Sequence, residues 1–358
     1  MNPDPIPRLR RAVADLPAYV PGRKATGADV AALASNESHL PPLPAVVAAV
    51  TAAAARANRY PDMASLALRE RLAVECGVDV GEVAVGPGSV GVLSQLVAAL
   101  CDPGDAVVFA WRSFEAYPIL CRIAGVQPVP VPLTAAEHHD LPAMVAAITE
   151  RTRIVLLCSP NNPTGTALSL EEVAAFLELV PPSVLVVLDE AYREYADADL
   201  DTVALYRRYP NLCLLRTFSK AYGLAGLRVG YAIARPELAE GLRRTQIPFS
   251  VSSVAEAAAL AALDEAATVA ERAAVVAAAR PLVEGAAREL GWQVPDGQAN
   301  FLWLRTTDAE FGPLLEAFDA ARILVRGYPG DGIRVTLADA ASNERVLKVL
   351  AGFRGAPG

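Results

Sequence analysis

The sequence predicts an α/β protein in which a large, mainly parallel sheet covered by helices is accompanied by a smaller α+β part. Hydrophobic residues make up 53% of the 358 residues and charged residues 20%, which is typical of a globular chain with a large core. In the middle of the chain, short apolar runs alternate with stretches of helical periodicity. Such runs are buried on both faces, as in a parallel sheet between layers of helices.

Six apolar runs predict the strands of the large sheet: EVAVG at 82–86, AVVFAW at 106–111, RIVLLCSP at 153–160, SVLVVLDE at 183–190, NLCLLRTF at 211–218 and RVGYAIA at 228–234. The intervening helices are expected at GVLSQLVAAL (91–100), PAMVAAITE (142–150) and LEEVAAFLEL (170–179).

The pattern changes towards the carboxyl terminus. Residues 254–290 are rich in alanine and predict a long helix that Pro281 kinks. Three further strands are expected at ANFLWLR (299–305), ILVRGYP (323–329) and GIRVTL (332–337), with helices at 310–322 and 343–353. We therefore expect an N-terminal arm with part of a small domain at 1–44, a large α/β domain at 45–250 and a small domain at 251–358.

Composition excludes several classes of function. A net charge of −8 argues against a surface for nucleic acid or an anionic membrane, and no apolar run reaches the roughly 20 residues of a membrane span. The first residues, MNPDPIPRLRR, contain no apolar stretch of the kind that a signal peptide needs. Five scattered cysteines fit reduced core residues of a cytoplasmic protein, and the three histidines have no metal-ligand spacing.

Polar and aromatic side chains follow the predicted strands where ligands of open parallel sheets bind, at the carboxyl ends of the strands. These candidates are Ser89, Phe114, Asn162, Asp189, Tyr192, Thr217, Ser219, Lys220 and Arg228. Each residue taken alone is more simply a turn, capping or packing residue. Their convergence on one edge of the sheet is the strongest functional signal in the sequence.

Lys220 stands out because the chain contains only three lysines, at positions 24, 220 and 348, among 32 basic residues. If only a positive charge were needed, arginine would be the usual choice of this chain. An arginine side chain stays protonated, whereas a lysine amine in a desolvated, positively charged pocket can lose its proton. Lys220 is therefore a candidate nucleophile.

Two nucleotide-binding interpretations compete for parts of this pattern. GPGSVG at 86–91 matches the G-x-G-x-x-G pattern between a strand and a helix, but the next strand ends in Trp111-Arg112 instead of the acidic residue that NAD requires; the arginine could suit NADP. VVLDE resembles the acidic motif of P-loop ATPases, yet the chain has no G-x-x-x-x-G-K-[ST]. A helix start such as 88–91 also binds phosphate.

The order of SPNNPTG (159–165), DEAY (189–192) and TFSKAYGLAGLRVGY (217–231) closely resembles the fold-type I aminotransferases that depend on pyridoxal 5′-phosphate. The similarity extends over nearly the whole chain and is greatest to the histidinol-phosphate aminotransferase branch. Within that branch, WRSFEAYP, PFSVSS and ILVRGYPGDGIRVT resemble actinobacterial aromatic-amino-acid (phenylalanine-type) aminotransferases. The resemblance implies a large domain with a mainly parallel sheet and a smaller α+β domain.

The resemblance also implies a role for each residue around the cofactor. Lys220 would carry the cofactor on its amine and move the proton, and Asp189 would keep the ring nitrogen protonated. Asn162 and Tyr192 would bind the phenolic oxygen, and Phe114 would stack on the ring. The phosphate group would be bound by Ser89, the N–H of Val90, Thr217, Ser219 and Arg228, with Tyr60 reaching the neighbouring subunit of a homodimer.

For the substrate, the resemblance implies that Arg334 grips the acidic group and that Tyr19 and Asn36 line the site. Arg326 is a further candidate for binding a carboxylate or a phosphate, with a surface loop charge as the alternative interpretation. We expect an aromatic L-amino acid as donor and 2-oxoglutarate as acceptor, with histidinol phosphate as the alternative donor. Val90 replaces an acidic residue that is frequent in histidinol-phosphate enzymes, which weakens that alternative, and VTLADAA lacks the glycine usual after Arg334. A binding or regulatory protein that kept the fold is the non-enzymatic alternative.

Overall fold

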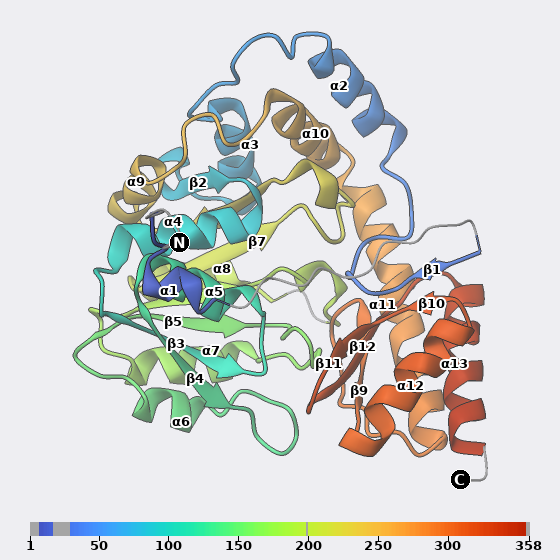
Figure 1. Ribbon diagram of the computed structural model, residues 1–358. Helices are drawn as coiled ribbons and strands as arrows, with labels where there is room; N and C mark the ends of the chain where they lie inside the picture. Colours follow the sequence, from blue (N-terminus) through green and yellow to red (C-terminus); the bar gives the residue numbers. More distant parts are fainter. Residues whose placement is uncertain (1–6, 17–28, 198–199, 356–358) are drawn as a thin grey trace, which may run out of the picture.

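The computed structural model describes residues 7–16, 29–197 and 200–355 (Figure 1). Within these residues the largest sheet has seven strands in the spatial order β2-β8-β7-β6-β5-β3-β4. Their bounds along the chain are β2 Val83–Gly86, β3 Ala106–Trp111, β4 Gln127–Pro132, β5 Thr152–Cys158, β6 Leu185–Asp189, β7 Leu212–Thr217 and β8 Gly230–Ile233. All of these strands run in one direction except β8, which is antiparallel to both of its neighbours. The predicted α/β class is confirmed.

Two strands differ from the sequence-based expectation. β8 is antiparallel because the connection from β7, residues 218–229, contains only one 3₁₀ turn, η3 (Ala225–Leu227), and no crossover helix that would return the chain to the opposite end of the sheet. β4 has the sequence QPVPVP and was not predicted, since its prolines remove N–H donors. Its place at the edge of the sheet is where proline is tolerated.

Helices cover both faces of this large sheet. On one face, α4 (Gly88–Leu100), α5 (Ala116–Ala124) and α9 (Pro236–Arg244) share a buried apolar cluster with the strands. On the other face, the cluster is completed by α6 (Leu141–Ala146), α7 (Leu170–Leu179) and α8 (Thr202–Arg208). Ser169 and Glu172 form a reciprocal capping box that starts α7. The strands are thus buried on both sides, as their apolar sequences predicted.

The C-terminal region packs around a three-stranded antiparallel sheet in the order β11-β12-β9, at the right of Figure 1. Its elements are α11 Ala266–Glu289, β9 Phe301–Arg305, α12 Asp308–Ala320, β10 Ile323–Leu324, β11 Arg326–Tyr328, β12 Gly332–Thr336 and α13 Ala340–Gly355. The helix that precedes them, α10 Ser253–Asp264, lies apart from this sheet at the top of Figure 1. The single kinked helix expected over 254–290 is instead two helices that meet at Glu265, and Pro281 lies inside the second.

The N-terminal part of the chain contributes to both regions. Its elements are α1 Arg11–Ala14, β1 Ala31–Ala32, α2 Pro44–Ala54, α3 Leu66–Cys76 and the 3₁₀ turn η1 Val80–Glu82. β1 pairs in parallel with β10 of the C-terminal region, whereas α3 packs near β2. The domain boundaries near residues 44 and 250 stay a prediction. None of the described helices combines the length and hydropathy that crossing a membrane requires.

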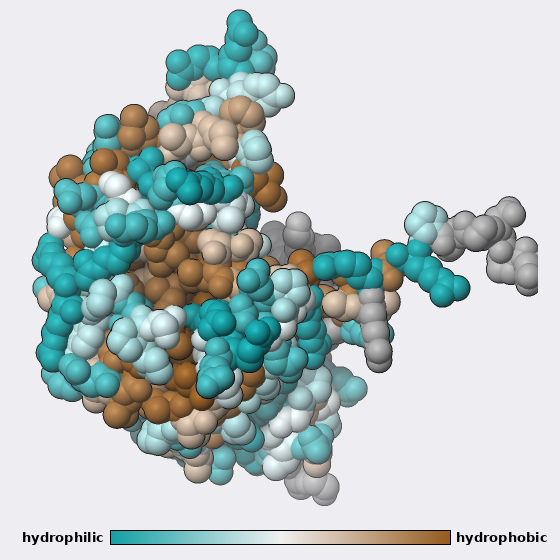
Figure 2. All heavy atoms as spheres, turned by 90° about the vertical axis from the view of Figure 1, so that its left-hand side faces the viewer, coloured by the Kyte–Doolittle hydropathy of each residue, from teal (hydrophilic) through white to brown (hydrophobic). Residues whose placement is uncertain are grey.

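The outer surface is mixed in character. Figure 2 shows apolar side chains gathered in the middle of one face, with hydrophilic residues around them. Singly exposed apolar residues such as Val74 and Leu179 are normal on globular proteins and need no ligand to explain them.

Strand register brings the predicted site residues to one edge of the large sheet. Cys158 at the end of β5 pairs with Asp189 at the end of β6. Gly230, at the start of β8, pairs with both Gly86 and Thr217. Because β8 runs the opposite way, its first residue lies beside the last residues of its neighbours, so the turns after β2, β6 and β7 meet.

A buried ion pair between Arg216 and Glu190 lies next to this edge of the sheet. Nε of Arg216 donates to Glu190 over 2.7 Å, and both side chains are about 95% buried. Thr202 joins the pair, donating to Glu190 and accepting from Arg216. Removing one member of such a pair leaves the other charge buried without compensation.

We expect Glu190→Ala to lower the free energy of unfolding by about 3–5 kcal/mol, because the Arg216 charge would stay buried without its partner. Urea denaturation followed by circular dichroism measures the change. Glu344→Ala, which breaks the exposed pair with Lys348, is the matched control and should change the midpoint little. Equal effects of the two substitutions would contradict this account.

Candidate active site

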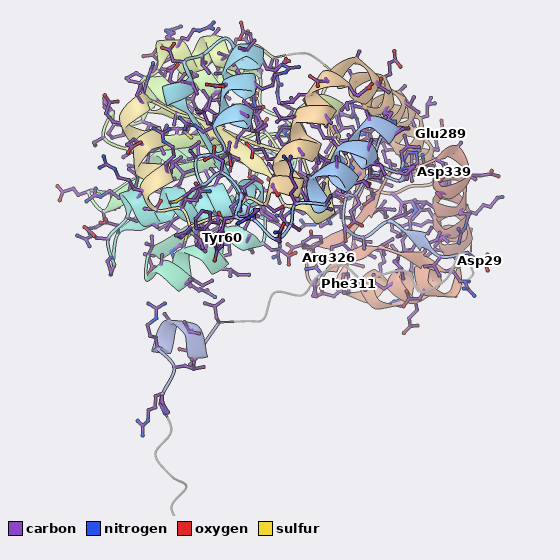
Figure 3. All side chains as sticks on the ribbon, turned by 90° about the horizontal axis from the view of Figure 1, so that it is seen from above. Asp29, Tyr60, Glu289, Phe311, Arg326 and Asp339 are labelled. Carbon is purple, nitrogen blue, oxygen red and sulfur yellow. The ribbon has the colours of Figure 1, made fainter. Side chains whose placement is uncertain are left out.

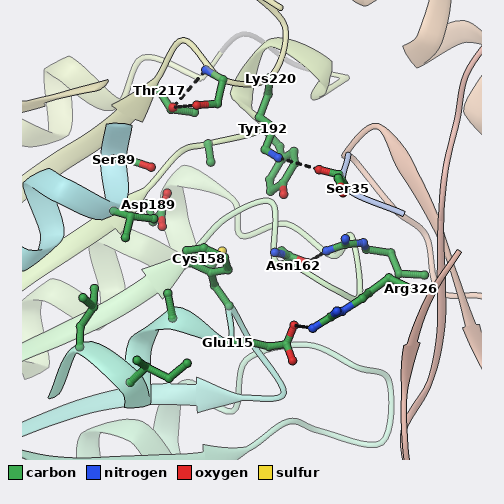
Figure 4. A pocket seen from close by; sticks show the side chains of 18 of the residues that line it. Ser35, Ser89, Glu115, Cys158, Asn162, Asp189, Tyr192, Thr217, Lys220 and Arg326 are labelled. Atoms are coloured by element: carbon green, nitrogen blue, oxygen red, sulfur yellow. Dashed lines mark hydrogen bonds and ion pairs between the residues drawn. The ribbon is translucent and has the colours of Figure 1, made fainter. Parts of the chain in front are cut away.

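A cavity of about 430 Å³ lies at the carboxyl edge of the large sheet, where the C-terminal region faces it. Figure 4 shows that side chains from both regions point into it. Most of the predicted site residues line the cavity: Ser89, Val90, Phe114, Asn162, Asp189, Tyr192, Thr217, Ser219, Lys220, Arg228, Arg326 and Arg334. The convergence inferred from strand order is therefore present in the fold.

One end of the cavity is built to hold an anion. α4 begins at Gly88, directly after Pro87, which has no side-chain group that could cap the first N–H groups of the helix. Gly88 has a φ of +77°, and a Cβ there would collide with the guanidinium of Arg228. A Cβ on Gly230 would in turn lie 2.7 Å from the backbone carbon of Gly88. Both glycines thus let three chain segments approach each other closely.

Hydroxyl groups and one guanidinium surround this helix start. Arg228 donates to the Ser219 hydroxyl over 3.1 Å, and Thr217 donates to the same hydroxyl over 3.0 Å. Ser89 stands on the first turn of α4 and lines the same cavity. Free N–H groups, hydroxyls and an arginine are the donors that bind a phosphate group.

The carboxylate of Asp189 lies in the middle of the cavity wall and is almost completely buried. Its Oδ2 accepts a hydrogen bond of 2.7 Å from the hydroxyl of Tyr117. Its Oδ1 is buried and meets no hydrogen-bond partner among the described residues. Burial raises the pKa of Asp189 to about 6, although Tyr117 opposes the shift. A ligand that offers an N–H at this point would satisfy the unpaired oxygen.

Lys220 follows β7 and points into the same cavity (Figure 4). Its Nζ donates to the Ser35 carbonyl over 3.1 Å and lies 5.6 Å from the centre of the Tyr192 ring. Burial, followed by the positive charge of Arg334, lowers the pKa of Lys220 to about 7. A large share of this amine is therefore unprotonated at neutral pH, as a nucleophile or base requires.

Asn162 and Tyr192 lie beside Lys220 on the wall of the cavity. Tyr192 is buried, its ring meets Phe301 edge to face at 5.2 Å, and burial raises the pKa of its hydroxyl. That hydroxyl accepts a hydrogen bond of 3.0 Å from Asn36, so its own proton stays available for donation. Asn162 accepts from Arg334 through Oδ1.

Two arginines enter the cavity from the C-terminal sheet. Arg334 on β12 is buried and donates to the Ala34 carbonyl over 2.7 Å, while its Nε meets no partner among the described residues. Arg326 on β11 forms an ion pair of 2.7 Å with Glu115. Figure 3 shows Arg326 at the junction of the two regions.

Three predicted site residues do not line the cavity within this chain. Asn36 is fully buried behind Tyr192, where it holds the hydroxyl in place. Tyr60 is 82% exposed and stacks on Phe249 with ring centres 4.5 Å apart, far along the surface from Arg326 in Figure 3. Tyr19 lies outside the described residues.

The sequence analysis missed three contributors. Tyr117 holds Asp189, the Ser35 carbonyl holds Lys220, and Glu115 pairs with Arg326. Tyr117 and Glu115 both lie in the quoted run WRSFEAYP, but nothing in a linear pattern assigns them to partners on other elements. A backbone carbonyl such as that of Ser35 accepts a hydrogen bond whatever its side chain, so the residue type does not reveal this role.

Together these groups define the chemistry that the cavity can support. It offers an anion site at one end. In the middle, Oδ1 of Asp189 can accept a ring N–H, and the amine of Lys220 lies beside it. Arginines at the far end suit the carboxylate of a substrate. Such an arrangement fits a flat phosphorylated ring with a carbonyl group, on which the amine can act.

Comparison with known proteins gives consistent results. The sequence model of the family "Aminotransferase class I and II" matches residues 28–350. An aromatic amino acid aminotransferase of Streptomyces coelicolor is 49% identical over 352 residues, covering 97% of this chain and 98% of the relative. One of Rhodococcus jostii is also 49% identical, covering 95% and 94%.

Solved structures share the fold. The histidinol-phosphate aminotransferase of Sinorhizobium meliloti, in complex with pyridoxal-5′-phosphate, superposes with a TM-score of 0.88 at 29% identity and covers 98% of each chain. A mutant aspartate aminotransferase of Thermus thermophilus has a TM-score of 0.82 at 24% identity, covering 97% of this chain and all of that one.

We expect Lys220 to react with acetic anhydride far faster than an ordinary lysine at neutral pH in the cofactor-free protein. With a pKa of about 7, about nine-tenths of the amine is unprotonated at about pH 8. Because only the unprotonated amine reacts, its rate should rise with pH and level off above pH ~8. Peptide mapping by mass spectrometry measures the rate, with exposed Lys348 as the comparison in the same sample. A rate for Lys220 that climbs steadily to pH ~10 would contradict the lowered pKa.

Proposed function

Because this chain belongs to the class I and II aminotransferase family, we propose that it transfers the amino group of an aromatic L-amino acid to 2-oxoglutarate, using pyridoxal 5′-phosphate. The observation that carries the proposal is the placement of Lys220, the unpaired Oδ1 of Asp189 and the uncapped start of α4 around one cavity. The fold-type I architecture and the enzyme class expected from the sequence are confirmed.

The residues of the cavity fit pyridoxal 5′-phosphate group by group. The first N–H groups of α4, with Ser89, Thr217, Ser219 and Arg228, would hold the phosphate. Asp189 would accept the N–H of the ring nitrogen, Asn162 and Tyr192 would bind the phenolic oxygen, and Phe114 would pack on the ring. When bound, this cofactor supplies an electron-accepting ring that stabilises negative charge at the substrate α-carbon.

The chain's own groups supply positioning and proton movement. Lys220 would take the α-proton of the substrate on Nζ and return it, since its lowered pKa leaves the amine free at neutral pH. An N–H at Oδ1 of Asp189 would stabilise the charged form of that carboxylate, which burial alone disfavours. Arg334 would orient the substrate by gripping its α-carboxylate with two parallel hydrogen bonds.

The aromatic substrate is supported by the names of the relatives that are 47–49% identical and by the apolar wall of the cavity. Phe114, Ile119, Leu120 and Tyr328 line it together with the two arginines. Histidinol phosphate remains the alternative, because Arg334 and Arg326 could also hold a phosphate group. The solved relative from Sinorhizobium meliloti carries that name.

We also propose a cytoplasmic homodimer. Tyr60, Ile247 and Phe249 are exposed apolar residues, and Tyr60 packs on Phe249 at the surface. In a dimer Tyr60 would reach the phosphate group bound by the partner subunit, which accounts for its distance from the cavity of its own chain. The five cysteines are free thiols, as in a reducing compartment.

The substrate assignment is tested by comparing L-phenylalanine, L-tyrosine, L-alanine and L-histidinol phosphate as amino donors. We expect kcat/KM to be higher for L-phenylalanine than for L-alanine. The ratio should correspond to a larger difference in free energy than the ~1–3 kcal/mol that one methylene supplies, because a whole ring enters an apolar pocket. Coupled assay of glutamate formation measures the rates. Lys220→Ala is the control for background turnover. A larger kcat/KM for L-histidinol phosphate would make that alternative correct.

Arg334→Lys should raise KM for both amino donor and 2-oxo acid by about 10-fold or more, since lysine cannot copy the two parallel hydrogen bonds of a guanidinium. The absorption spectrum of the bound cofactor should stay unchanged, because Arg334 contacts the substrate. Steady-state kinetics with each substrate varied in turn measures the effect. A change in KM for only one of the two partners would contradict a shared carboxylate site.

A further inference from the structure

The substrate end of the cavity contains an ion pair that no proposed catalytic step uses. Glu115 and Arg326 are 2.7 Å apart, with side chains 28% and 12% exposed, and they come from residues 211 positions apart. Figure 4 shows the Glu115 carboxylate pointing across the cavity towards Arg326. Both residues belong to the lining of the cavity. The pair therefore forms part of the surface that a substrate side chain meets.

Glu115 lies at the start of α5, and its side chain makes no capping hydrogen bond to that helix. It is the residue that precedes α5, a helix of nine residues, so its charge lies at the positive end of the helix dipole. The neighbouring residues Phe114 and Ala116 also line the cavity. The carboxylate is thus positioned by the large-sheet region, whereas its arginine partner comes from the C-terminal sheet.

The ion pair also separates two cavities. A second cavity of about 750 Å³ shares Glu115, Ile119 and Arg326 with the first. Its further lining includes Trp111, Pro118 and Pro130. Anything that reaches beyond the first cavity in this direction must pass the Glu115–Arg326 pair.

The charges on the wall formed by Glu115, Arg326 and Arg334 determine which substrate side chains bind favourably. The Tyr328 ring centre lies 5.6 Å from the guanidinium of Arg326 and 5.8 Å from that of Arg334. The two arginines therefore flank one aromatic ring, and alone they would favour a substrate with two anionic groups. Glu115 cancels one of these charges. A carboxylate that approached Arg326 would also meet the like charge of Glu115.

We propose that Glu115 is a specificity-determining residue: by pairing with Arg326 it makes the side-chain end of the cavity neutral, which favours aromatic rings over a second anionic group. This inference rests on the proposed function for the identity of the preferred donor. A dicarboxylic acceptor such as 2-oxoglutarate must compete with Glu115 for Arg326, whereas an aromatic ring leaves the pair intact. The residue thus sets the relative affinity of the two substrates.

A second ion pair between the same two regions provides a matched control. Arg112 pairs with Asp331 at 2.6 Å, and its guanidinium lies 4.5 Å from the centre of the Trp111 ring. Neither residue lines the first cavity. Asp331→Asn therefore breaks an ion pair between the same two regions at a carboxylate that does not line the substrate site.

The test measures binding of two unreactive acids to the holoenzyme by calorimetry. Glutarate carries two carboxylates, and 3-phenylpropionate carries one carboxylate and an aromatic ring. We expect Glu115→Gln, which keeps the shape but removes the charge, to tighten glutarate binding about tenfold. The affinity for 3-phenylpropionate should change about twofold or less, because a ring does not use the charge of Arg326. Asp331→Asn should leave the ratio of the two affinities as in the wild type.

Two results of this experiment would contradict the proposal. An unchanged glutarate to 3-phenylpropionate ratio in Glu115→Gln, or the same shift in Asp331→Asn, would overturn the role of Glu115. Thermal unfolding of the holoenzyme checks that the Glu115→Gln variant is folded, and Glu115→Ala provides a second neutral variant that should shift the ratio in the same direction.

Kinetics separates this inference from the proposed function. In the Glu115→Gln enzyme, kcat/KM for L-glutamate relative to L-phenylalanine should rise about tenfold, because the second carboxylate no longer meets the like charge of Glu115. If the wild-type enzyme uses no aromatic donor, the proposed function fails. The calorimetric ratio still decides whether Glu115 excludes a second anionic group.

Discussion

The buried carboxylate of Asp189 is the constraint around which the site is arranged. Burial makes its charged form costly, and within the described part of the chain its Oδ2 is bonded to the Tyr117 hydroxyl while its Oδ1 meets no partner. A polar atom left unpaired in the interior costs free energy that packing elsewhere must offset. The same water-poor cavity lowers the pKa of Lys220, so burial moves the pKa of the carboxylate and the pKa of the amine towards neutral pH. A ligand with a ring N–H and a carbonyl group would satisfy both at once.

The geometry of the site depends on a short segment that belongs to neither sheet face. The Ala34 carbonyl accepts from Arg334, the Ser35 carbonyl from Lys220, and Asn36 donates to Tyr192. Asn36 is in turn bonded to Thr336, 300 positions away in the sequence. Residues 34–36 thus join Lys220 of the large-sheet region to Arg334 of the C-terminal region, so that the amine and the guanidinium keep a fixed separation.

The two ends of the cavity differ in charge, and this difference determines which ligand group each end favours. The end near α4 combines Arg228 with hydroxyls and helix N–H groups, and among the cavity-lining residues no carboxylate belongs to that end. The end near the C-terminal sheet holds two arginines but also Glu115. A phosphate group is therefore favoured at the first end, and at the second a molecule with one carboxylate and a neutral side chain fits the balance of charges.

The sequence by itself predicted six of the seven strands of the large sheet, the polar residues that follow them and Lys220 as the candidate nucleophile. These features depend on local periodicity and on residue chemistry, which a linear pattern records directly. The tertiary structure decided the antiparallel direction of β8, the burial of Asn36 behind Tyr192 and the pairs Tyr117–Asp189 and Glu115–Arg326. Each of these depends on which surfaces pack together: Glu115 precedes α5 and Arg326 lies on β11, 211 residues further along the chain, and no local pattern specifies that they meet.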